Sequence, residues 1–149
     1  MTVQPRLNRA HLDSLTATQW HHLARLRQDV FIVEQECAYS DLDGRDLEPG
    51  TLQLWLEDEN GAVVATLRIL HEHGGATRRI GRVATRADAR GRGLMGRLLT
   101  AAIEACAGFE IELEAQAHLQ GWYERFGFVR SGDEFLEDGI PHVPMVRAA

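Results

Sequence analysis

The sequence contains no lysine, and its sixteen basic residues are all arginines. A Walker phosphate loop is therefore excluded, because that loop requires G-x-x-x-x-G-K-[ST]. No apolar run approaches the roughly 20 residues that a membrane-spanning helix needs, and the first residues, MTVQPRLNRAHLD, have no apolar core that could act as a secretory signal. Two cysteines, Cys37 and Cys106, do not make a disulfide framework and have no C-x-x-C neighbourhood. We therefore expect a reduced, cytoplasmic setting and no membrane partner.

What is present fits a single domain covering residues 1–149, with 44% hydrophobic and 26% charged residues and no repeat. The net charge of -6 is unevenly distributed. Seven arginines lie within twenty residues that contain a single acidic residue, Asp88. They are Arg78, Arg79, Arg82, Arg86, Arg90, Arg92 and Arg97. Such an island in an acidic chain favours a compact polyanionic ligand. A long nucleic acid is disfavoured, since its sites usually carry more spread-out charge and stacking aromatics. The alternative is that arginine replaces lysine through genomic composition and that these side chains are simply solvated. It would explain the missing lysine but not the clustering.

Hydrophobic periodicity predicts the order of the elements. Residues 18–36 predict a helix with a stripe of Leu23, Leu26, Val30 and Val33, capped by Thr16 or Thr18. A polar loop at 37–50 precedes strands at 52–57 and 62–70, which Asn60-Gly61 joins as a hairpin. The remaining pattern predicts a third strand at about 78–85, a helix after residue 93, a strand at 109–116, a short helix at 117–126 and two closing strands within 127–147. This order predicts an α/β (α+β) fold with a mixed sheet.

The stretch 89-ARGRGLMGRLL-99 contains the dinucleotide-binding string G-x-G-x-x-G at Gly91, Gly93 and Gly96. In dinucleotide-binding domains the first glycine ends a strand almost directly. Here residues 86–90 stand between the strand and Gly91, and no second βαβ unit follows. A nicotinamide- or flavin-binding domain is therefore disfavoured.

The same loop chemistry would serve another phosphate-bearing ligand. Glycines let backbone N–H groups approach a phosphate, and the positive end of the following helix favours an anion. Arg90, Arg92 and Arg97 add guanidinium groups suited to phosphate oxygens. The alternative is a glycine-rich turn that merely enters an ordinary helix.

The loop resembles the acetyl-coenzyme A loop of GNAT-type N-acetyltransferases, R-x-x-G-x-[GA]. Arg90 and Gly93 match that pattern, while Met95 stands where a small residue is usual and Gly96 follows one place later. The chain is also similar to the bacterial ElaA branch of this superfamily over 33–48, 115–128 and 137–145. The resemblance extends from about residue 20 to residue 147.

A second GNAT signature, N-x-x-A-x-x-[FL]-Y-x-x-x-G-F, resembles 116-QAHLQGWYERFGF-128. Tyr123, Gly127 and Phe128 are kept, whereas Gln116 and Leu119 replace the usual Asn and Ala. The resemblance implies a GNAT fold: a mixed, mostly antiparallel sheet, splayed between its central strands and flanked by helices.

The resemblance also implies that acetyl-coenzyme A lies in the splay between the strands at 80–85 and 110–115. The implied donor-binding residues belong to the first strand, the glycine loop and the start of the second signature: Arg82, Val83, Ala84, Arg90, Gly91, Arg92, Gly93, Leu94, Met95, Gly96 and Gln116. A backbone N–H of the first strand would polarise the acetyl carbonyl.

The implied reaction transfers the acetyl group directly to a primary amine of a small molecule or peptide, and Tyr123 protonates the leaving thiolate. The general base is left open among five side chains, or a water relay: Glu34, Glu112, Glu114, His118 and His142. Of these five side chains, Glu112 and His118 are predicted, together with Tyr123, to be catalytic residues. The expected acceptor-binding residues are Glu34, Tyr39, Asp41 and His142. Glu112 and Glu114 could instead form a salt-bridged strand face, and His118 could cap a helix.

The acidic loop 39-YSDLDGRDLE-48 is interpreted as a wall that attracts a cationic amine or, equally, as a solvated turn. It lacks the full calcium-binding pattern, and His71-Glu72-His73 lacks the zinc spacing H-E-x-x-H, so no metal site is expected. Two other function classes stay open: a non-catalytic acyl-coenzyme A sensor and a nucleic-acid binder. A homodimer is possible.

Overall fold

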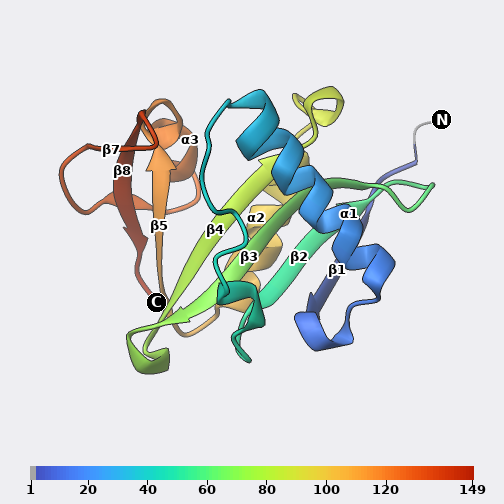
Figure 1. The fold of residues 1–149 in the computed structure, drawn as a ribbon. Coiled ribbons are helices and arrows are strands. Elements are labelled where there is room, and N and C mark those ends of the chain that lie inside the picture. The colour runs from blue at the N-terminus through green and yellow to red at the C-terminus, as the bar shows by residue number, and fades with distance from the viewer. Residues whose placement is uncertain (1–2) are drawn as a thin grey trace.

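The computed structural model describes residues 3–149, whose strands form one mixed sheet flanked by helices (Figure 1). The strand order is β1-β2-β3-β4-β5-β8-β6, with β7 paired to β8, and every pair is antiparallel except β4 with β5. The strands are β1 (Arg6–His11), β2 (Leu52–Glu57), β3 (Val63–Glu72), β4 (Thr77–Thr85), β5 (Glu110–Gln116), β6 (Val129–Arg130), β7 (Phe135–Glu137) and β8 (Ile140–Arg147).

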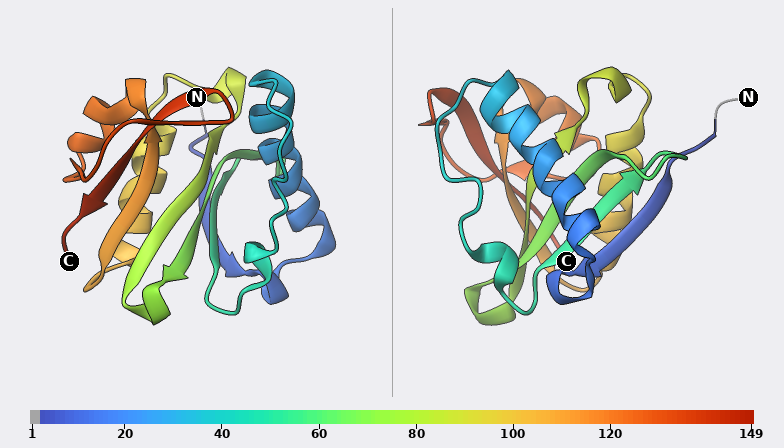
Figure 2. Two further views of the ribbon diagram at one scale, coloured as in Figure 1. Left: turned by 60° about the vertical axis from the view of Figure 1, so that its left-hand side comes forward. Right: turned by 45° about the vertical axis from the view of Figure 1, so that its right-hand side comes forward.

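The helices cover both faces of the sheet, with α1 (Ala17–Arg27) on one side and α2 (Leu94–Ala105) on the other (Figure 2). Both faces of β2 and β3 are therefore covered, and every residue of VVATLRIL is buried, including Thr66 and Arg68. One core lies under α2 and includes Leu54, Leu67 and Leu98, and a second lies under α1 around Trp55. None of the described helices is both long enough and apolar enough to cross a membrane.

Helix α1 begins with a capping box and ends in a π-helix. The Thr16 hydroxyl accepts a hydrogen bond from the Gln19 backbone N–H at 3.1 Å, and the Gln19 side chain accepts one from the Thr16 N–H at 2.9 Å. The helix then widens into η2 (Gln28–Glu34). Leu23, Leu26 and Val30 of the predicted stripe are buried, but Val33 is 64% exposed. The wider turn carries more residues, so Val33 is rotated away from the sheet.

Two strand predictions need correction. Strand β1 was not expected, because RLNRAH has little apolar alternation; it pairs with β2 from Arg6↔Glu57 to His11↔Leu52. The closing region holds three strands instead of two, of which β6 has only 2 residues. The other predicted strands and helices are present with boundaries shifted by a few residues.

The sheet splays between its central strands. Strands β4 and β5 pair only where residues 77–79 meet residues 110–112. Beyond that point the two strands diverge (Figure 1). The predicted mixed sheet with a central splay is therefore confirmed.

Candidate functional site

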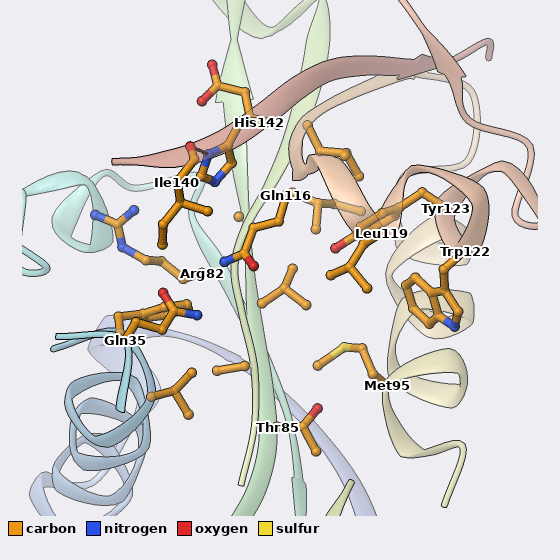
Figure 3. Close-up of a pocket in the computed structure, with 18 of the residues that line it drawn as sticks. Gln35, Arg82, Thr85, Met95, Gln116, Leu119, Trp122, Tyr123, Ile140 and His142 are labelled. Atoms are coloured by element: carbon orange, nitrogen blue, oxygen red, sulfur yellow. Dashed lines mark hydrogen bonds between the residues drawn. The ribbon is translucent and has the colours of Figure 1, made fainter. Parts of the chain in front are cut away.

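A cleft of about 1040 Å³ opens where β4 and β5 diverge. Its walls come from η2, the divergent end of β4, the glycine loop, the helices that follow β5, and the β7–β8 hairpin. Figure 3 shows side chains from all sides pointing into this space, among them Gln35, Arg82, Gln116, Tyr123 and His142. The cleft is as large as the largest ordinary ligand sites in proteins, which reach about 1,000 Å³.

The backbone of β4 forms the floor of the cleft. Its register against β3 shifts between Thr66 and Arg68, and Arg82 has a φ of +51° at this bulge. On the other side, residues 80–85 have no partner strand among the described residues. An unpaired strand edge presents backbone N–H and C=O groups that a ligand can satisfy.

Arg82 is held by the loop that precedes β2. Its Nε lies 2.9 Å from Asp41 Oδ1 and its Nη2 lies 3.3 Å from Asp43 Oδ2. The guanidinium also lies over the Tyr39 ring, 5.3 Å from the centroid, and the Tyr39 hydroxyl donates to Asp41 Oδ1 at 2.9 Å. Burial, and then the Asp41 carboxylate, raise the pKa of Tyr39 above its usual range, so the phenol remains a donor. These contacts stabilise the bulged, left-handed backbone at Arg82.

The aspartates of the acidic loop bind arginines of the fold, although Asp43, Leu47 and Glu48 stay exposed. Asp41 and Asp46 are buried, and both bind the buried Arg27, which lies 3.0 Å from Asp41 Oδ2 and 2.9 Å from Asp46 Oδ1. Asp43 binds Arg68 at 2.7 Å, and this hydrogen bond holds the pKa of Asp43 well below its usual range. The prediction of an acidic attractive wall was wrong for these aspartates, because arginines from α1 and the sheet neutralise them.

The glycine loop has the backbone that its sequence implies. Gly91 and Gly93 have φ values of +77° and +73°, and a Cβ at either position would meet nothing within 4 Å. Gly93 is the N-cap of α2, so the free N–H groups of the first helical turn follow it. Gly96 instead has a helical backbone and faces Phe126. The loop thus presents backbone N–H groups without side-chain obstruction at residues 91 and 93.

Most of the arginine island serves the fold. Arg78 stacks on Phe109 with 3.7 Å to the ring centroid, and Arg79 binds Glu112 at 3.0 Å. Arg90 does line the cleft, where its Nη1 lies 2.8 Å from Glu34 Oε2. The cluster was interpreted as favouring a compact polyanionic ligand, but strand and loop partners account for much of it.

Arg92 is exposed and does not line the cleft. All the other predicted donor-binding residues line it.

Tyr123 projects from α3 (Gln120–Glu124) into the cleft (Figure 3). Its ring packs edge-on against Trp122 at 4.9 Å and Phe128 at 6.0 Å between centroids, and the residue is 5% exposed. Burial raises the pKa of Tyr123 to about 12. The phenol therefore keeps its proton at neutral pH and can donate it.

The opposite wall carries the predicted acceptor residues Glu34, Tyr39 and His142, and His118 also lines the cleft. Asp41 lies behind this wall as the partner of Arg82 and Tyr39. Glu112 lies outside the cleft lining, at the closed end of the splay, where it contacts Arg79 and His73 at 3.0 and 3.1 Å. The salt-bridge interpretation of Glu112 therefore fits the structure better than a base role.

Glu72, His73 and Glu112 approach one another closely enough to suggest a metal group, with donor atoms within 4.8 Å. Arg45 contacts Glu72, and Arg79 contacts both glutamates. Because guanidinium groups already neutralise these carboxylates, we assign the cluster to the surface ion pairs of the sheet end.

Comparisons with known proteins agree with this geometry. The family described as "Acetyltransferase (GNAT) domain" matches residues 28–149. The chain belongs to the GNAT acetyltransferase family. A UPF0039 protein of Mycobacterium tuberculosis is 49% identical over 95% of this chain and 92% of its own length, and protein ElaA of Escherichia coli is 38% identical over 92% of each. These relatives support the ElaA-like branch.

Solved structures give the same result. An acyl-CoA N-acyltransferase from Pseudomonas aeruginosa superposes with a TM-score of 0.91 at 38% identity, covering 97% of this chain and 99% of that one. The E. coli ElaA crystal structure gives 0.90 at 34%, covering 96% and 99%. Membership of the GNAT family supports acyl transfer as the general activity.

Some cleft residues of this GNAT protein were missed by the sequence analysis. Phe31 and Gln35 enter the cleft from η2 and the residue after it, and Glu137 and Ile140 enter it from the closing hairpin. The apolar stripe before Val33 does not indicate a π-helix. The directions in which the π-helix turns its side chains could therefore not be predicted. The closing hairpin was predicted, but its sequence does not indicate that it folds back over the splay between β4 and β5.

Proposed function

We propose that this GNAT protein is an acetyl-coenzyme A-dependent N-acetyltransferase that moves an acetyl group directly to a primary amine of a small molecule or peptide. The observation that carries the proposal is the unpaired edge of β4, which faces one cleft together with the glycine loop and Tyr123. A thioester laid along that edge would place its phosphates and its acyl group at opposite ends of one groove.

The residues present fit such a donor. Residues 82–84 would pair with the amides of the pantetheine arm, and the N–H groups of residues 91–96 would hold the pyrophosphate. Arg90 and Gln116 line the same cleft. The open space where a Cβ would stand at Gly91 and Gly93 is the space that a phosphate needs.

The chemistry follows from the two ends of the cleft. A backbone N–H of β4 would polarise the acyl carbonyl as charge develops on its oxygen. Tyr123 would give its proton to the sulfur when the carbon–sulfur bond breaks, and the amine would approach from the wall formed by Glu34, Tyr39 and His142. No covalent bond to the protein is required.

Isothermal titration with acetyl-coenzyme A and with NAD tests the donor. We expect binding of acetyl-coenzyme A and none of NAD, because the loop follows β4 through residues 86–90 instead of directly ending the strand. Tight NAD binding without thioester binding would contradict the proposal. Release of coenzyme A in the presence of a panel of amines then separates an enzyme from an acyl-coenzyme A sensor, which would bind the donor without turnover.

Gly93→Ala is expected to weaken coenzyme A binding about tenfold or more, because the new methyl group occupies the approach to the helix N-terminus. The left-handed backbone also makes the change cost about 1–2 kcal/mol of stability. Gly61→Ala is the matched control: its φ of +79° is similar and its Cβ is equally unobstructed, but it lies in the β2–β3 hairpin. Equal affinities for the two variants, measured by titration, would contradict the phosphate role of this loop.

A further inference from the structure

His142 is held in a fixed position at the acceptor side of the cleft. It lies on β8, where its Cα pairs with that of Gln116 on β5, so the two side chains share one face of the sheet. Its side chain is only 12% exposed and stacks on Phe135 with 5.9 Å between ring centroids and 25° between planes. Figure 3 shows the imidazole above Gln116 and beside Ile140, directed into the cleft.

One contact defines the tautomer of this imidazole. Nδ1 lies 2.7 Å from the carbonyl oxygen of Ile140. A carbonyl oxygen can only accept a hydrogen bond, so Nδ1 carries the hydrogen and the neutral ring keeps a lone pair on Nε2. Nε2 lies 3.8 Å from Glu137 Oε2, which is too long for a hydrogen bond but close enough to stabilise a positive ring. The geometry is that of a base with a carboxylate beside it.

The carboxylates near the cleft are less suited to take a proton. Glu34 is ion-paired with Arg90 at 2.8 Å, and Glu114 lies 3.7 Å from Arg79. Glu112 is outside the cleft lining and contacts the same Arg79. Each of these carboxylates is already in contact with an arginine. His118, Glu137 and Asp138 also line the cleft, and of these Glu137 is the carboxylate beside His142.

We propose that His142 is the general base of the reaction, a role that rests on the proposed N-acetyltransferase function. Nε2 accepts a proton from the acceptor ammonium, and Glu137 stabilises the resulting imidazolium. The neutral amine nitrogen then forms a bond to the acyl carbon as the carbon–sulfur bond breaks. Tyr123 gives a proton to the sulfur and regains one from the nitrogen as the amide forms. His142 releases its proton to solvent, which completes the balance of one proton per turnover.

Two acceptors that differ in protonation give the decisive experiment. An alkylamine is an ammonium at neutral pH and needs a base, whereas the hydrazide of the same carbon skeleton is already neutral. His142→Gln should lower kcat about 10²–10³-fold with the alkylamine and by less than tenfold with the hydrazide. Added imidazole should restore part of the alkylamine rate to His142→Ala. His21→Gln, on the exposed surface of α1, is the matched histidine control and should behave as wild type.

A readout without turnover tests the same assignment. Nitrogen-15 NMR of labelled histidine should show His142 protonated at Nδ1 and unprotonated at Nε2, and titration should give the same coenzyme A affinity for wild type and His142→Gln. Equal losses with the two acceptors, a proton on Nε2, or an alkylamine-specific loss in His118→Gln but not in His142→Gln would overturn the proposal. If wild-type protein acetylates no amine, the proposed function itself fails and the base role fails with it. An active wild type with equal losses overturns the base role alone.

Discussion

Tyr123→Phe is expected to lower kcat about 10²-fold while leaving coenzyme A affinity and stability nearly unchanged. A positioned general acid contributes about 10²–10⁴-fold, and a thiolate is a fair leaving group, so the lower end of that range applies. The ring would stay packed against Trp122 and Phe128, because only the hydroxyl is removed. Since burial raises the pKa of Tyr123 to about 12, the wild-type phenol holds the proton that it must donate.

The acidity of the leaving thiol provides the test of this role. Donors whose thiols are more acidic than coenzyme A need less help from an acid, so the ratio of wild-type to Tyr123→Phe kcat should shrink along such a series. Steady-state kinetics measure the ratio, and thermal unfolding with coenzyme A titration serves as the folding and binding control. A ratio close to one for every donor would assign Tyr123 to packing alone, and a larger ratio that does not change with thiol acidity would contradict proton donation to the sulfur.

Local patterns in the sequence were sufficient for much of the fold. The Asn60-Gly61 turn joins β2 to β3, with the Gly61 N–H donating to the Asp58 carbonyl at 3.0 Å, and Thr16 caps α1. Both features depend on residues within four positions of one another. Strand β1 was missed because its only signal is pairing with β2, more than forty residues away.

The candidate site shows the same contrast between local patterns and partners that are distant in the sequence. The glycine loop could be predicted from its local physical chemistry and Tyr123 from the resemblance to the second GNAT signature, and both line the cleft. The role of Asp41 could not, because its partners Arg27 and Arg82 are 14 and 41 positions away. Sequence charge alone made Asp41 and Glu112 look available to a substrate, and in the folded protein arginines bind both.

The buried ion network makes the loop before β2 part of the fold, and Asp46 is its most buried acid. Asp46 accepts hydrogen bonds from Arg27 at 2.9 and 3.1 Å and from Gln53 at 2.7 Å, and it lies 3.3 Å from Arg68. Burial alone would raise the pKa of Asp46, but the hydrogen bonds and charges of these arginines outweigh it and hold the pKa below its usual value. Removing this carboxylate leaves two buried guanidinium groups short of one negative charge.

Asp46→Asn is therefore expected to lower the free energy of unfolding by about 3–5 kcal/mol at neutral pH. Urea unfolding measures this, and Glu48→Gln is the matched control, because its partner Arg45 is in the same loop but both side chains are about a third or more exposed. That exposed pair should contribute less than about 1 kcal/mol. Equal effects of the two substitutions would contradict the buried network.

The pH dependence has a defined sign. A carboxyl group whose pKa is lower in the folded than in the unfolded state contributes stability above its unfolded pKa, about 3.9 for Asp, and loses it as pH falls through the folded value. Asp43 and Asp46 are both lowered. The stability of the wild type should therefore fall below about pH 4, and its advantage over Asp46→Asn should shrink with it. A stability difference between the two proteins that stays constant at acidic pH would mean that the asparagine disrupts packing rather than charge.

Because Asp43 and Asp41 also bind Arg82, loss of the network should distort the floor of the cleft before the chain unfolds.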